Sequence, residues 1–160
     1  MSDFSLWETA FEPEYEAPEK RMVIKLAVAD ISATAPFYRH FLGRAPSLQT
    51  ADRAEFEAED PAVRIILTRS DAPKAAAGHY GFQMKNTRFI EEAEKRLVES
   101  GFKLTDEDDV ACCYAVQTKV WAADPGGNRW EFFVTTEAEA DEGCGPDCIC
   151  HQDLERTYVA

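Results

Sequence analysis

The chain has 160 residues, of which 45% are hydrophobic, and it carries a formal net charge of −13 at neutral pH. This length is sufficient for one compact domain with a hydrophobic core. The acidic balance argues against binding to nucleic acid or to anionic membranes, because both need a basic surface. No apolar run approaches the ~20 residues that span a bilayer, and the start of the chain lacks the basic-then-apolar pattern of a signal peptide. The five cysteines, an odd number, favour a reducing cytoplasm over a secreted disulfide scaffold.

The charge divides the chain into three segments. Residues 1–21 contain six acidic and two basic residues, which predicts an acidic N-terminal arm. Residues 137–160 contain seven acidic residues and one basic residue, together with three of the cysteines, which predicts an acidic cysteine-rich tail. Residues 22–136 are closer to charge balance and have the apolar content of a folded domain.

The first half of this domain, residues 22–70, begins with an apolar run at 22–28 that predicts a strand. Asp30 or Ser32 can cap the helix that follows, because either side chain can accept a hydrogen bond from a helix N-terminal amide. Gly43 can end that helix, since glycine readily adopts the left-handed conformation found there. Three extended segments are expected next, at 47–50, 54–58 and 63–68.

The second half, residues 78–136, repeats this order after a linker at 70–77. A strand at 78–84 precedes a helix that is capped by Asn86 or Thr87 and ended by Gly101. Extended segments are expected at 103–106, 113–122 and 129–135, with the acidic run 106–109 as a loop. Two βαβββ modules predict an α+β fold in which eight strands form a curved mixed sheet around a cleft.

Two adjacent cysteines, Cys112 and Cys113, are the most informative residues of the chain. One trans peptide holds their Cα atoms about 3.8 Å apart, which is shorter than the roughly 4.4–6.8 Å of a relaxed disulfide. Thiolates are soft ligands, so the pair can chelate a thiophilic centre such as trivalent arsenic or cadmium. The alternative is two small apolar strand residues. Neighbouring strand side chains face opposite sides, so both thiols reach one cleft only where the backbone is irregular, as the loop at 106–109 would allow.

His79 and Glu131 are the candidate hard ligands. His79 lies on the first strand of the second module and Glu131 on its last strand. A glutamate between Trp130 and Phe132 is seldom buried without a partner, so a functional role is favoured for it. His79 could equally be an ordinary strand histidine that makes one backbone hydrogen bond. Lys119 and Trp121 are interpreted as scaffold or pocket wall.

Two further patterns accompany the modules. Residues 110–121 read Val-Ala-Cys-Cys-Tyr-Ala-Val-Gln-Thr-Lys-Val-Trp, and residues 124–131 read Asp-Pro-Gly-Gly-Asn-Arg-Trp-Glu. With the first helix ending in Leu42 and Gly43, residues 21–136 resemble the vicinal oxygen chelate superfamily, which includes glyoxalase I, extradiol dioxygenases and bleomycin-resistance proteins. The run around Cys112 is similar to the branch of organoarsenical C–As lyases and cadmium-inducible proteins.

This resemblance implies a non-haem Fe(II) dioxygenase that uses O2 to convert methylarsenite into arsenite and a one-carbon aldehyde. Cys112 and Cys113 would hold the arsenic, and His79 and Glu131 would bind iron, with Glu131 as the catalytic residue. The remaining family ligand falls on Val23, where the family usually carries His or Gln. Valine cannot bind a metal, which favours a protein that binds without turnover. The resemblance also implies a homodimer.

The tail contains Cys144, Cys148, Cys150 and His151, whose spacing does not match a standard zinc finger. Such a density of soft ligands suggests capture of As(III) or Cd(II); the alternative is a tail with incidental thiols. Three functions therefore remain open. The first is an Fe(II)-dependent C–As lyase, the second a thiol-based arsenic- or cadmium-sequestering protein, and the third a generic glyoxalase-like or drug-binding protein with incidental cysteines.

Overall fold

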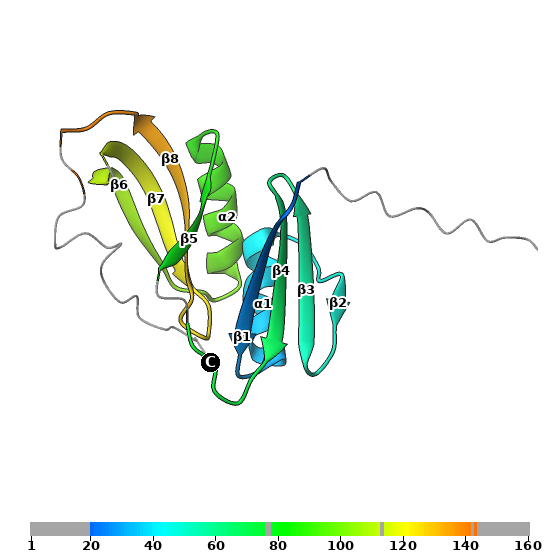
Figure 1. Cartoon of the computed structure of the whole chain (residues 1–160). Helices are drawn as coiled ribbons and strands as arrows, with labels where there is room; N and C mark the ends of the chain where they lie inside the picture. Colours follow the sequence, from blue (N-terminus) through cyan, green and yellow to red (C-terminus); the bar gives the residue numbers. More distant parts are fainter. Residues whose placement is uncertain (1–19, 76–77, 113, 142, 144–160) are drawn as a thin grey trace, which may run out of the picture.

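The computed structural model describes residues 20–75, 78–112, 114–141 and 143. Two βαβββ modules follow one another along the chain (Figure 1), which confirms the predicted repeat and the α+β class. The first module comprises β1 (Met22–Val28), α1 (Ile31–Leu42), β2 (Leu48–Gln49), β3 (Arg53–Glu59) and β4 (Ala62–Arg69). The second comprises β5 (His79–Gln83), α2 (Thr87–Glu99), β6 (Leu104–Cys112), β7 (Ala115–Ala123) and β8 (Arg129–Glu137).

The eight strands form two mixed sheets of four strands each, one per module. The strand orders are β1-β4-β3-β2 and β5-β8-β7-β6. In each sheet the first strand of the module runs parallel to the last, and the other neighbours are antiparallel. A parallel pair needs a long crossover, and the helix after each first strand begins that crossover.

The helix ends follow from the predicted caps. Asp30 accepts a hydrogen bond from the amide of Ala33 at 3.2 Å. Gly43 and Gly101 have φ values of 64° and 84°, in the left-handed region that glycine adopts without a Cβ clash. Asn86 occupies the N-cap position of α2 without a side-chain hydrogen bond to the helix.

The acidic run 106–109 was wrongly predicted as a loop, because it lies within β6. The pairing of β6 with β7 shifts register between Glu107 and Val110, and Asp109 has a φ of 47°. β6 is the outermost strand of its sheet. Edge strands often carry charged residues and bulges, so these acids are compatible with strand structure.

One hydrophobic core joins the two modules through α1. Phe41 stacks on Phe132 of the second sheet with ring centroids 4.5 Å apart, and it also contacts Trp130 at 5.0 Å. Tyr38 donates a hydrogen bond to Asp124 at 2.5 Å and packs on Phe56 of the first sheet. Both sheets therefore turn their helix-facing sides into a shared core, and the other side of each sheet carries the polar residues. Within the described residues, no helix is long and apolar enough to cross a membrane.

Candidate functional site

Polar side chains gather on the side of the second sheet that faces away from the core, called here the outer face. Trp130 and Phe132 belong to the core, so Glu131 between them points to the opposite side. By the same alternation, Lys119 and Trp121 of β7 flank the core residue Val120 and share the outer face with Glu131. The predicted ligand His79 enters this face from β5.

Glu131 lies at the centre of the group and is only 7% exposed. Its Oε1 atom is 3.4 Å from His79 Nε2, and its Oε2 atom is 3.2 Å from Lys119 Nζ. Oε2 is buried, and among the described residues no hydrogen bond to it has good geometry. Its partner is the Lys119 ammonium, with which it forms an ion pair. A buried carboxylate needs a charge partner to offset the lost hydration, and Lys119 supplies it.

Lys119 was interpreted as scaffold from the sequence, but the structure places its ammonium between the soft and the hard candidate ligands. Its side chain is 2% exposed. Burial lowers the pKa of Lys119, but the Glu131 carboxylate and a hydrogen bond with Cys112 outweigh that effect and raise the pKa above its usual value. The lysine is therefore charged at neutral pH. The sequence offered one signal for this role: strand alternation places Lys119 and Glu131 on the same face of the sheet.

Trp121 forms an aromatic wall beside this group. The His79 ring meets the indole edge-on at a centroid distance of 4.9 Å, and Lys119 Nζ lies 5.4 Å from the indole centroid. The indole Nε1 donates a hydrogen bond of 2.9 Å to Glu107 on β6. These contacts fix the tryptophan, which excludes water from one side of the Lys119–Glu131 pair.

Gly81 provides the space that Glu131 occupies. The two residues are paired between β5 and β8. A Cβ atom at Gly81 would lie 2.8 Å from Cγ and 2.9 Å from Oε1 of Glu131, which is closer than van der Waals contact. A side chain at Gly81 would therefore displace the carboxylate.

Cys112 is the last residue of β6 and is 1% exposed. It pairs with Ala115, the first residue of β7, and Tyr114 between them has a φ of 62°. The backbone next to Cys112 is thus irregular at Tyr114, in addition to the irregularity at Asp109 within β6. The Cys112 thiol reaches Lys119. Cys113 lies outside the described residues.

The chain returns to this hairpin after β8. The amide of Ala140 donates a hydrogen bond of 2.8 Å to the carbonyl of Tyr114. Gly143 lies against the Tyr114 ring, where an added Cβ would be 3.0 Å from Cζ. The tail therefore leaves the described part of the chain beside the turn that follows Cys112. The predicted tail ligands, Cys144, Cys148, Cys150 and His151, lie outside the described residues.

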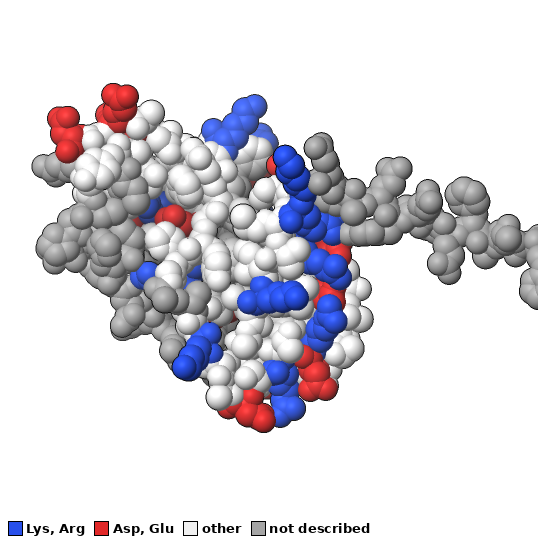
Figure 2. Space-filling view, viewed as in Figure 1, with Lys and Arg blue, Asp and Glu red and all other residues white. Residues whose placement is uncertain are grey.

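Val23 lies on β1 of the first sheet and is 50% exposed. It pairs with Arg64, which forms ion pairs with Glu55 and Glu57. Basic and acidic side chains alternate over this sheet (Figure 2). Among the described residues, no group of three His, Cys, Asp or Glu side chains could hold a metal. Within these parts of the chain, the two candidate ligands His79 and Glu131 therefore have no third such side chain beside them.

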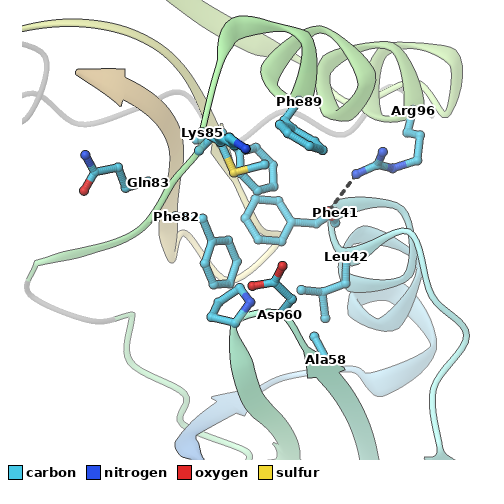
Figure 3. Close-up of a pocket in the computed structure, with 12 residues that line it drawn as sticks. Phe41, Leu42, Ala58, Asp60, Phe82, Gln83, Lys85, Phe89 and Arg96 are labelled. Atoms are coloured by element: carbon cyan, nitrogen blue, oxygen red, sulfur yellow. Dashed lines mark hydrogen bonds between the residues drawn. The ribbon is translucent and has the colours of Figure 1, made fainter. Parts of the chain in front are cut away.

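A cavity of about 380 Å³ lies elsewhere, between α1, α2, β5 and the β3–β4 turn (Figure 3). Aromatic rings line it, among them Phe41, Phe82, Phe89 and Phe132. Arg96 at its rim donates hydrogen bonds to carbonyls at the end of α1, which is a structural role. The cavity shares no lining residue with the Glu131 group, because Phe132 faces the other side of β8.

Comparison with known proteins supports the fold and identifies the family. Residues 22–132 match the family described as the glyoxalase/bleomycin resistance protein/dioxygenase superfamily. The chain belongs to this superfamily. A trivalent organoarsenical cleaving enzyme of Thermomonospora curvata is 34% identical over 134 residues, which cover 79% of this chain and 89% of that enzyme. The cadmium-induced protein CadI of Mycobacterium bovis is 29% identical over 126 residues, which cover 79% of this chain and 83% of CadI.

Solved structures of the superfamily share the fold at lower identity. A glyoxalase/bleomycin resistance protein/dioxygenase from Nocardioides superposes with a TM-score of 0.57 at 19% identity, covering 81% of this chain and 92% of that one. A member from Alicyclobacillus acidocaldarius gives a TM-score of 0.58 at 16% identity, covering 75% and 94%. Two four-stranded sheets with two helices are thus the superfamily arrangement.

The contact between Gly81 and Glu131 generates a stability prediction. Gly81→Ala should lower the free energy of unfolding by roughly 1–3 kcal/mol, because the new methyl group overpacks a buried carboxylate. Gly78→Ala is the matched control, since nothing lies within 4 Å of a Cβ at that position. Urea denaturation of both variants measures the difference. Equal stability of the two variants would contradict the packing described here.

Proposed function

We propose that this protein binds trivalent organoarsenicals through Cys112 and Cys113 and cleaves their C–As bond in a reaction that needs Fe(II) and O2. The observation that carries the proposal is the placement of Cys112, Lys119, Glu131 and His79 on one face of the second sheet. The similarity to enzymes named for cleaving trivalent organoarsenicals supports it.

The thiols are suited to the substrate. Methylarsenite carries two hydroxyl groups on arsenic, and each can be exchanged for a thiol. Every exchange forms one As–S bond, breaks one As–O bond and releases one water that takes up the thiol proton. Two adjacent cysteines thereby hold the arsenic while the methyl group stays attached. Soft sulfur ligands prefer this centre to hard cations.

His79 and Glu131 fit Fe(II) as a partial ligand set. An imidazole and a carboxylate are two of the three ligand groups of the non-haem iron triad. Glu131 is buried with its Oε1 atom 3.4 Å from His79 Nε2, and Gly81 leaves the carboxylate room beside β5. When bound, Fe(II) supplies the activation of O2 for attack on the arsenic-bearing carbon. Trp121 keeps water from that side, and the positioned thiols turn a bimolecular encounter into an oriented one.

The missing ligand is expected from outside this half of the chain, and we propose a homodimer. The first sheet exposes Met22 and Val23 on β1, at 67% and 50%. The two side chains face opposite sides of β1, and Val23 is an exposed apolar residue that a second copy could cover. Analytical ultracentrifugation should give a dimer for the intact protein and a shift toward monomer for Val23→Glu. A monomeric intact protein would contradict this part of the proposal.

A second function, sequestration of arsenicals or cadmium without turnover, is favoured by Val23. The residue offers no metal-binding atom and is half-exposed on the other sheet. In that case Cys112 and Cys113 bind the thiophile, and His79 and Glu131 have no iron to hold.

Single-turnover chemistry distinguishes the two functions. The protein is reconstituted with Fe(II) without oxygen, methylarsenite and O2 are added, and the arsenic species are quantified over time. We expect arsenite to form with the intact protein. Cys112→Ser should bind fewer methylarsenite molecules per chain and release no arsenite, whereas His79→Ala should bind methylarsenite as the intact protein does and release no arsenite. His40→Ala, a histidine on α1 away from the group, is the control. Bound methylarsenite without arsenite in the iron-loaded protein would establish sequestration and contradict the lyase.

The cysteines of the tail are proposed as a second thiol site for As(III), because Gly143, the residue before the first of them, lies beside the hairpin that follows Cys112. Truncation after Gly143 preserves the Ala140 and Gly143 contacts and removes Cys144, Cys148, Cys150 and His151. Arsenic analysis of protein saturated with arsenite should then give fewer As(III) per chain than the full-length protein. An unchanged ratio would assign all binding to the cysteine pair.

A further inference from the structure

Lys119 has the contacts of a fixed counter-ion. Its side chain is 2% exposed, its Nζ atom lies 3.2 Å from Glu131 Oε2, and it reaches Cys112 and the face of Trp121. A buried ammonium is costly unless carboxylates, hydrogen bonds or aromatic faces replace its water. Lys119 has one partner of each kind, namely Glu131, Cys112 and Trp121, and these contacts stabilise the buried charge.

The same contacts mean that the Glu131 carboxylate does not need a metal ion to balance its charge. In many buried sites a carboxylate is neutralised by a bound divalent ion, but here a positive charge from the protein already lies against Oε2. A divalent ion held by His79 and Glu131 would share one carboxylate with the ammonium. Two cations that share a carboxylate repel each other in a partly dry environment.

We propose that Lys119 is a built-in cation of the Glu131 site, which stabilises the site without a metal and competes electrostatically with any divalent ion that binds there. Lys119 thereby keeps Cys112 and Glu131 in position in the metal-free protein, and it lowers the affinity of the site for a divalent ion. This inference rests on the proposed assignment of His79 and Glu131 as metal ligands.

The test uses the full-length protein, Lys119→Met and the surface control Lys95→Met, with Mn(II) as a redox-inert probe. Lys119→Met keeps the length of the side chain and removes its charge. In chelator its Tm should fall by about 10 °C, because Glu131 is left buried and unpaired. Mn(II) should restore that Tm and should bind at least about tenfold more tightly than to the intact protein in calorimetry. Lys95→Met should match the intact protein in both measurements, since its side chain is mostly exposed.

A double variant keeps the inference testable if Lys119→Met folds poorly. Lys119→Met with Glu131→Gln removes both charges, so it should recover most of the lost Tm and should not bind Mn(II). An unchanged Mn(II) affinity in Lys119→Met, absence of Mn(II) binding in both proteins, or a double variant no more stable than Lys119→Met would overturn the proposal. Methylarsenite binding to Cys112 and Cys113 is measured in the same variants. A failure confined to the Mn(II) and Tm results therefore leaves the arsenical site standing.

Discussion

The outer face of the second sheet depends on one buried ion pair, between Lys119 and Glu131. Both side chains are withdrawn from water, and each supplies the charge that the other needs. The surrounding residues follow from this pair. Gly81 leaves space for the carboxylate, and Trp121 covers the ammonium. His79 contacts Oε1, the carboxylate oxygen that does not face Lys119, and Cys112 provides a second partner for the lysine.

The pair is held in position by the hydrophobic core on the other side of the same strands. Trp130 and Phe132 pack against Phe41 and Tyr38 of α1, which ties the second sheet to the first module. Glu131 between them is thereby fixed in register, with neighbours that cannot rotate. Because side chains of β8 alternate between the two faces, Trp130 and Phe132 pack in the core and Glu131 lies on the outer face. Strands position ligands more rigidly than loops do.

Much of this arrangement could be predicted from the sequence. Glycines at 43 and 101 and a polar cap at Asp30 identified the helices, and their recurrence predicted two equal modules. The alternation around Glu131 predicted its orientation toward a partner. The acidic run 106–109 was misassigned, since composition favours a loop there whereas its place at a sheet edge makes a charged strand acceptable. The importance of Lys119 was missed, because the shared face with Glu131 becomes evident only once β7 and β8 are known to be neighbours.

The proposed site has a soft half and a hard half on one sheet. Cys112 represents the soft half, and Glu131 with His79 the hard half, with Lys119 in contact with both sides. The measurement that tests this account most directly is X-ray absorption at the arsenic edge for methylarsenite bound to the protein truncated after Gly143, which lacks the tail cysteines. The account predicts two sulfur neighbours and one carbon neighbour around arsenic, and loss of the sulfur signal when Cys112 and Cys113 are replaced by serine. Arsenic surrounded by oxygen, or an unchanged sulfur signal in that variant, would contradict it.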